Sequence, residues 1–246
     1  MEKITRARTG IHLPSVDPRD KDEVLDRIVT AGDSLPEITL QMSSSQAHRA
    51  AAELEQDAGP LTHWDVLRLI IGVVETLFDD EVKGFSPAFH AQLLIMLQFP
   101  SVPEAVSTQI AFGRKVGEMS LKKIERLSDA ADKRGLSVDE HVADLAARDE
   151  IEHDLPVRCF LGESRRNPDQ ARMRRVIDLF RVTAALAIEP LRPPVLCVIS
   201  WTLWALGKRS VALAYLREAS EIDPTYPLAA GLTTHIRQRQ PQWIQA

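Results

Sequence analysis

Cysteine, aromatic residues and long apolar runs are all scarce in this chain of 246 residues. Its two cysteines, Cys159 and Cys197, are too few for a disulfide framework, which favours a reducing, cytoplasmic compartment. The longest apolar run, residues 193–206, is shorter than the roughly 18 residues that a membrane-spanning helix needs. The polar, basic residues 1–10 contain no apolar stretch typical of a secretory signal. We therefore expect a soluble cytoplasmic protein without a membrane partner.

Motifs for nucleotide binding and for nucleophilic catalysis are also missing. The chain has neither G-x-x-x-x-G-K-[ST] nor G-x-G-x-x-G, and no G-x-S-x-G nucleophile turn. Glu150 and His153 form a single E-x-x-H pair, whereas a carboxylate-bridged metal site in a helical bundle needs two such pairs and further carboxylates. Arg158 beside Cys159 is a pattern that can lower a thiol pKa, but no base accompanies it. We predict no catalytic residue, no cofactor and no metal ligand.

Charge is unevenly distributed along the chain, whose formal net charge is −5. Residues 156–246 hold 13 basic side chains and 7 acidic ones, a local balance of +6, whereas residues 1–155 carry −11. The acidic excess is strongest in residues 129–154, with nine acids and three bases. A basic end is typical of proteins that bind nucleic acid or an acidic partner. It is equally compatible with attraction between the two parts of one chain.

Helical periodicity and helix caps recur along the chain, while a strand-like pattern is confined to Glu37–Met42. Ser86 with Pro87, and the S-x-x-E capping box that begins at Ser137, are the clearest helix starts. The stretch 194–206 carries no charge on any side, so we expect it at the centre of the fold. The fold class is therefore predicted to be all-α, a helical bundle. Helices are expected over residues 17–31, 43–58, 62–78, 86–97, 101–112, 120–135, 137–151, 167–188, 194–206, 210–222 and 227–239.

Composition and helix pattern together divide the chain into three sections. Residues 1–16 are predicted to be a flexible N-terminus, residues 17–155 an acidic helical part, and residues 156–246 a basic helical part packed on it. The polar stretch 155–166 is also predicted to be flexible. A shift of 34 residues superimposes Pro190 on Pro224, and 34 residues is the period of tetratricopeptide helix pairs. We predict a short tetratricopeptide-like repeat at the C-terminal end, although its first helix lacks the W-x-x-L-G signature.

A W-x-x-W pair, a glycine turn and a D-P-x-Y ending follow one another in this repeat. The positions that carry the pattern are Trp201, Trp204, Gly207, Ala212, Leu216, Ala219, Asp223, Pro224 and Tyr226. Together with the stretch LLIMLQFPSVPEAV, they resemble the actinobacterial domain-of-unknown-function 4192 family. Members of that family begin with an α/β region that has no counterpart here, so the resemblance implies only their helical C-terminal part. The family has no established activity, and the resemblance implies no catalytic residue.

These observations favour a protein–protein interaction or structural module without catalytic activity, because stacked helix pairs commonly present binding surfaces. We expect an acidic protein partner to contact six cations, namely Arg165, Arg166, Arg172, Arg175, Lys208 and Arg209. The alternative is a DNA-binding or regulatory protein that uses the arginine-rich segment 165–181. A second form of this alternative uses residues 121–146, which resemble the two helices of ribbon–helix–helix repressors. Those repressors need a strand before the helices, and residues 109–119 fit a strand poorly.

Overall fold

All regular secondary structure in the described part of the chain is helical, which confirms the all-α prediction. The structure is a computed structural model that describes residues 12–32, 63–79 and 84–245, and no strand occurs within these ranges. In chain order the elements are α2 (Pro18–Gly32), α5 (His63–Thr76), α6 (Pro87–Leu97), α7 (Val102–Phe112), α8 (Arg114–Asp132), α9 (Val138–Ala147), α10 (Leu155–Phe160), α11 (Gln170–Leu186), the 3-10 turn η1 (Glu189–Leu191), α12 (Arg192–Ala205), α13 (Arg209–Ile222), α14 (Pro227–Gln238) and α15 (Gln242–Gln245).

Several helix starts are fixed by side-chain caps, which satisfy backbone N–H groups that a helix start leaves without partners. The Ser86 hydroxyl accepts a hydrogen bond from a backbone N–H in the first turn of α6. At α9 the side chains of Ser137 and Glu140 each cap the other residue's backbone N–H, so the predicted capping box is confirmed. Asp169, and not the predicted Asn167, caps α11.

α8 begins at Arg114 and not at the predicted Ser120. Ser120 is buried, and its hydroxyl lies 3.1 Å from that of Thr108, so it joins α8 to α7 instead of capping a helix. Gly113 makes the corner between the two helices with a φ of 87°, a conformation that favours glycine. A Cβ at Gly117 would lie 2.6 Å from a side-chain oxygen of α7, so the missing side chain allows the close packing of the two helices.

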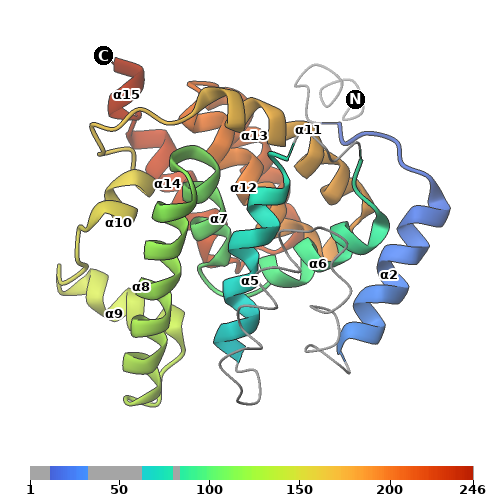
Figure 1. Cartoon of the computed structure of the whole chain (residues 1–246). Coiled ribbons are helices and arrows are strands. Elements are labelled where there is room, and N and C mark those ends of the chain that lie inside the picture. The colour runs from blue at the N-terminus through green and yellow to red at the C-terminus, as the bar shows by residue number, and fades with distance from the viewer. Residues whose placement is uncertain (1–11, 33–62, 80–83, 246) are drawn as a thin grey trace.

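α12 lies at the centre of the fold, as its uncharged sequence predicts (Figure 1). Every residue from Pro193 to Ala205 is buried, and the helix packs against α7, α11, α13 and α14. Trp201 and Trp204 are the largest fully buried side chains of the described residues. An aromatic side chain buries about 150–250 Å², which corresponds to roughly 4–6 kcal/mol of gross burial energy before entropic costs. The two buried tryptophans therefore contribute strongly to the packing of the neighbouring helices on α12.

α7 connects the acidic and basic parts of the chain within one hydrophobic core. Its residues are buried from Val102 to Phe112, with the exception of Glu104. The helix packs against α5 and α8 from the acidic part and against α10, α11 and α12 from the basic part. One cluster of buried residues extends from Val24 in α2 to Ile236 in α14.

The stretch 155–166, predicted to be flexible, is instead ordered around the short helix α10. Asp154 caps this helix, and Pro156 and Cys159 are buried in it. The indole N–H of Trp201 donates to the carbonyl of the last α10 residue at 2.8 Å. The stretch is polar on average, but its few apolar residues are the ones that contact the core. Average polarity was therefore a poor guide to its order.

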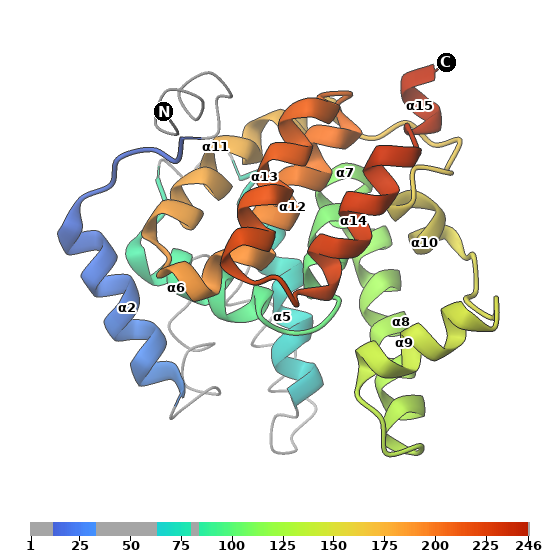
Figure 2. The same ribbon diagram turned by 180° about the vertical axis from the view of Figure 1, so that it is seen from behind.

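α9 packs mainly on α8, and the C-terminal half of α8 together with α9 extends from one end of the molecule (Figures 1 and 2). We call residues 124–154, which include the loop after α9, the arm. At another edge, α2 packs against α6 and α11. The predicted strand 37–42, the predicted helix 43–58 and residues 1–11 of the predicted flexible N-terminus lie outside the described residues. No helix in the described part of the chain is long and apolar enough to cross a membrane.

The helices α11, α12, α13 and α14 form two consecutive helix pairs at the C-terminal end. Gly207 makes the turn between α12 and α13 with a φ of 78°. After α13, the Asp223 carboxylate accepts hydrogen bonds from the backbone N–H and hydroxyl of Thr225, and Pro224 follows outside the helix. The fully buried face of α13 contains the motif residues Ala212, Leu216 and Ala219. The tetratricopeptide-like character of these pairs stays a prediction.

Candidate functional site

Five of the six cations predicted to contact an acidic partner are exposed, and four of these five lie in two loops outside the body of α11. Two follow α10 in the loop before α11, and two lie at the start of α13; they are Arg165, Arg166, Lys208 and Arg209. The structure gives none of them an ion-pair partner among the described residues. We call these four residues the basic end.

Contacts between helix ends bring the two loops of the basic end to the same end of the fold. The backbone N–H of Asp169, before α11, donates to the Ala111 carbonyl at the end of α7 at 2.7 Å. The neighbouring Phe112 ring lies 5.4 Å from the Trp243 ring of α15. Trp243 in turn donates its indole N–H to the Ala205 carbonyl at the end of α12, at 2.9 Å. The loop before α11 and the turn before α13 are therefore joined through α7 and α15, at the top of Figures 1 and 2.

The C-terminal residues 239–245, which we call the strap, hold this end of the fold together. The backbone N–H of Gln242 donates to the Gly162 carbonyl at 2.8 Å, which fixes the loop that follows α10. The indole N–H of Trp204 donates to the Arg239 carbonyl at 3.2 Å. All three tryptophans of the basic part thus donate to backbone carbonyls of loops or helix ends.

An aromatic cluster lies beneath the strap. The rings of Phe160 and Trp201 are stacked, with centroids 5.7 Å apart and planes 3° from parallel. Trp204 makes edge-to-face contacts with Trp201, His235 and Trp243 at centroid distances of 6.2, 5.2 and 6.5 Å. Stacked and edge-to-face arrangements are the favourable ones for aromatic pairs. The W-x-x-W pair of the sequence motif therefore binds the α10 loop and the strap to α12.

Gly162 is the one position in this cluster where a side chain does not fit. Its φ is 73°, and an added Cβ would lie 2.7 Å from the Trp204 ring and 3.0 Å from the backbone of Pro241. A residue with a Cβ would be strained by the backbone conformation and would also displace the ring. The close contact between the α10 loop, α12 and the strap therefore depends on glycine here.

The other two predicted cations, Arg172 and Arg175, bind atoms of the same chain. The Arg172 guanidinium donates to both carboxylate oxygens of Glu75, at 2.9 and 3.2 Å, and lies 3.7 Å from the centroid of the Phe78 ring. Arg175 donates to the Asp79 carbonyl at 3.1 Å. The attraction between the basic and acidic parts of the chain is thus present at these residues. We remove both arginines from the predicted partner surface.

Two features of the DNA-binding alternative differ from the structure. Residues 109–119, where a ribbon–helix–helix repressor has its strand, belong to the end of α7 and the start of α8. Within the arginine-rich segment, Arg181 donates to the Asp178 carboxylate at 3.3 Å and to the His12 carbonyl at 2.7 Å. The segment therefore does not present all its arginines to a common ligand.

The E-x-x-H pair does not occupy one helical turn, because residues 150–154 follow α9 without helical structure. Glu150 lies 3.3 Å from Arg148, and His153 lies 3.5 Å from Glu163. Throughout the described ranges, no group of three or more histidine, cysteine, aspartate or glutamate side chains is placed to hold a metal ion.

Burial determines the chemistry of both cysteines. Cys159 is fully buried, and the loss of hydration raises the pKa of its thiol; a hydrogen bond from Ser164 and the charges of Arg166 and Arg158 act in the opposite direction and are weaker. Burial in α12 raises the pKa of Cys197 well above its usual range. The pattern of an arginine beside Cys159 therefore does not produce an activated thiolate.

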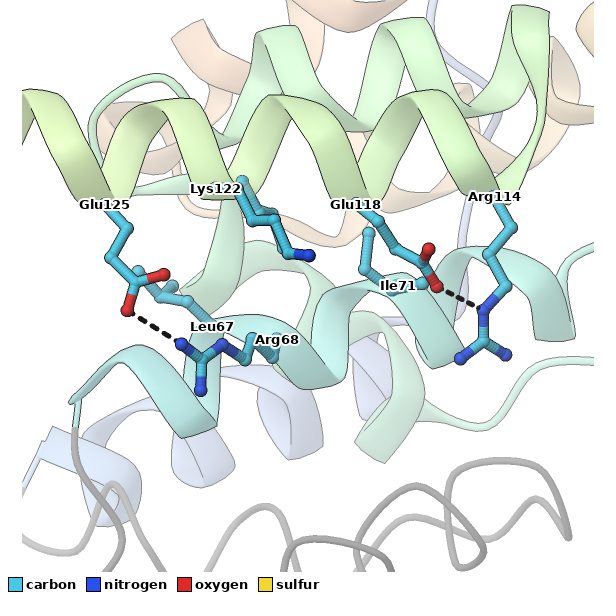
Figure 3. A pocket seen from close by; sticks show the side chains of 8 residues that line it. Leu67, Arg68, Ile71, Arg114, Glu118, Lys122 and Glu125 are labelled. Atoms are coloured by element: carbon cyan, nitrogen blue, oxygen red, sulfur yellow. Dashed lines mark hydrogen bonds and ion pairs between the residues drawn. The ribbon is translucent and has the colours of Figure 1, made fainter.

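A shallow groove of about 200 Å³ separates α5 from α8 (Figure 3). Charged side chains line its edges, where Arg68 pairs with Glu125 and Arg114 pairs with Glu118, both at 2.7 Å. Lys122 lies between these two pairs on α8. The groove is closed by apolar side chains of Leu67, Ile71 and Leu121. Because its edge charges largely pair with one another, the groove offers less unpaired charge than the basic end.

Sequence reasoning missed contributors to the basic end that lie outside the basic part of the chain. Lys115 is exposed in the first turn of α8, close to the end of α7, but it belongs to the part of the chain that is acidic as a whole, where no cation was predicted to contact a partner. α8 and α13 both start at this end, after Gly113 and Lys208, and neither residue supplies a side-chain cap. The N–H groups of these two helix starts add positive potential to that of the cations.

We compared the chain with models of protein families, with curated proteins and with solved structures. None of the three comparisons gives a match. The resemblance to an actinobacterial family stays a prediction that rests on the motif residues. Function is therefore argued from the geometry and charge of the site.

Proposed function

We propose that this protein is a helical interaction module whose basic end binds an acidic segment of a protein partner. One observation carries the proposal. The four cations of the basic end are exposed, have no ion-pair partner among the described residues, and come from two loops that the strap joins.

The loops that carry the cations are held in place before any partner binds. Main-chain hydrogen bonds at Gly162 and Asp169 fix the loop before α11, and the Trp243 indole fixes the end of α12. A preorganised surface loses less conformational entropy on binding than a flexible one. Arginine also binds carboxylates through two parallel N–H···O bonds, so Arg165 and Arg166 are well suited to aspartate and glutamate side chains.

An acidic protein segment fits the surface better than duplex DNA does. All four arginines of α11 make intramolecular contacts, namely Arg172, Arg174, Arg175 and Arg181. The four cations of the basic end, together with Lys115, neutralise fewer phosphates than the roughly 6–10 contacts typical of salt-dependent DNA binding. The net charge of −5 also opposes approach to a polyanion as extended as DNA.

Charge reversal tests the proposal with a fluorescein-labelled peptide of alternating glutamate and serine. Exposed charge pairs contribute about 0.2–1 kcal/mol each, so we expect weak, salt-sensitive binding and a loss of roughly tenfold in affinity for R165E/R166E. The matched control is R19E/R217E, which reverses two exposed cations of α2 and α13, outside both the basic end and the arm, with the same change in net charge. The control should bind the peptide as the unmodified protein does.

Fluorescence anisotropy at low salt distinguishes the outcomes. No binding by the unmodified protein, or an equal loss in R165E/R166E and R19E/R217E, contradicts the proposal, because the effect would then be absent or independent of location. A duplex of about 20 base pairs that binds more tightly than the peptide at the same salt would favour the nucleic-acid alternative instead.

A further inference from the structure

The arm carries exposed carboxylates without partners. Residues 129–154 hold nine acidic and three basic side chains. Four exposed acids of this region have no hydrogen-bond or ion-pair partner for their side chains among the described residues: Asp129, Asp132, Asp149 and Glu152. The molecule therefore has an unpaired negative surface as well as an unpaired positive one.

Two of the arginines of the arm do not neutralise these carboxylates, because they are bound to another acid. Arg134 and Arg148 both contact the Asp144 carboxylate at 2.7 Å. Together these cations hold the pKa of Asp144 below its usual range, with the hydrogen bond from Arg134 as the largest cause. Arg148 also contacts Glu150 at 3.3 Å. Arg126 and Lys133 are exposed and offset part of the negative charge, but acids outnumber bases by nine to three in residues 129–154, so the arm is acidic on balance.

The tip of the arm, which carries Asp129 and Asp132, is too far from the basic end of the same molecule for their charges to neutralise each other. α8 runs for 19 residues from Arg114, beside the basic end, to Asp132 at the tip of the arm. At about 1.5 Å per residue this helix separates its two ends by roughly 27 Å, which exceeds the Debye length of about 8–10 Å at moderate salt. Figures 1 and 2 show the start of α8 and the tip of the arm at opposite ends of the molecule.

We infer that the acidic partner of the basic end is a second copy of this chain, whose arm docks on the basic end in a head-to-tail contact. This inference rests on the proposed function, since it names the partner of the same surface. The charges are complementary, with four unpaired cations on the basic end and an arm whose acids outnumber its bases and whose tip carries Asp129 and Asp132 without partners. Each docked molecule keeps a free arm or a free basic end, so the contact repeats into rings or open chains.

Sedimentation velocity over a range of protein concentrations tests the inference with the full chain. At about 20 mM salt the average mass should rise with concentration, and at about 500 mM salt the protein should be monomeric. The basic-end variant R165E/R166E and the arm variant D129K/D132K should each associate at least about tenfold more weakly. Asp129 and Asp132 lie in the last turns of α8, where lysine suits the helix dipole, so the arm variant should fold.

Mixing the variants tests whether the two surfaces meet. R165E/R166E mixed with D129K/D132K should associate again, because the first variant keeps an intact arm and the second keeps an intact basic end. The matched control is D20K/D22K, which gives the same charge change on exposed positions of α2 and leaves both surfaces unchanged. By itself this control should associate as the unmodified protein does. A loss of association in D20K/D22K equal to that in D129K/D132K overturns the inference, because net charge alone would explain it, and so does a variant mixture that stays monomeric.

Two further results separate this inference from the proposed function. If the unmodified protein stays monomeric at low salt but binds the glutamate peptide, the basic end has another acidic partner and the inference is wrong. If it neither associates nor binds the peptide, both the inference and the proposed function are wrong.

Discussion

Acidification is expected to destabilise the protein through His90 in α6, whose side chain is 5% exposed. Its Nδ1 lies 2.9 Å from the Thr183 hydroxyl, which donates its only hydrogen to the Leu179 carbonyl at 3.0 Å. Nδ1 is therefore the donor to Thr183, and the imidazole is neutral with its proton on Nδ1. The rings of Phe85 and Phe89 lie 6.5 and 6.1 Å away. Burial among such groups lowers the pKa of His90 from 6.5 to about 4.

The sign and size of the effect follow from proton linkage. The unfolded chain protonates His90 near pH 6.5, whereas the folded protein protonates it near pH 4. Stability is therefore complete above pH 6.5 and is lost as the pH falls from 6.5 towards 4. At about 1.4 kcal/mol per pKa unit, the loss in the free energy of unfolding is about 2 kcal/mol by about pH 5 and about 3 kcal/mol at full titration.

Urea unfolding at neutral pH and at about pH 5, followed by circular dichroism, measures this loss. The comparison protein is H90N, whose amide N–H replaces the Nδ1 donor to Thr183 and does not titrate. Over the same pH interval H90N should lose about 2 kcal/mol less than the unmodified protein. The carboxylates affect both proteins alike, so the difference isolates the histidine. Equal losses in the two proteins would show that protonation of His90 does not destabilise the folded protein.

Three further predictions concern packing and reactivity. Gly162→Ala should lower the free energy of unfolding by about 2–4 kcal/mol in urea, because the new Cβ would lie 2.7 Å from Trp204; a loss under about 0.5 kcal/mol would contradict the described packing. Arg172→Met should lower the free energy of unfolding by about 2 kcal/mol, because it removes the partner of the half-buried Glu75. Adding Glu75→Gln should recover part of that loss. A double variant that is no more stable than the single one would argue against a stabilising ion pair. The buried, raised-pKa Cys159 should react with iodoacetamide only as the protein opens, and labelling at the rate of a free thiol would show that it is accessible.

Local signals in the sequence were sufficient to predict most of the helices. The capping box at Ser137 fixes the start of α9 through contacts within a single turn, so nothing outside the motif is needed to predict it. α12 was predicted to be central because an uncharged helix can only be stable when its whole surface is covered. The start of α8 was missed because Gly113 turns the chain without a capping side chain, and a capping residue was sought at Ser120.

The candidate site could be predicted only in part, because it depends on contacts between distant residues. Arg165 and Arg172 are both arginines in a basic stretch, so the sequence does not separate them. Only Arg172 is bound by Glu75, which lies 97 positions away in the sequence. Sequence patterns also did not show that Gly162 receives the strap, since that contact joins loops that are distant in the chain. Only the three-dimensional fold shows which cations are paired and how far the basic end lies from the tip of the arm.

Titration of the glutamate peptide against K208E/R209E, side by side with R165E/R166E, measures whether the four cations of the basic end form one binding surface. We expect each pair of substitutions to weaken binding by roughly tenfold, because both loops contribute to that surface. Lys208 and Arg209 lie at the start of α13, where glutamate suits the helix dipole, so loss of folding is not expected. If only one pair of substitutions, or neither, weakens binding, the four cations do not form a single binding surface and the basic end is not the partner site.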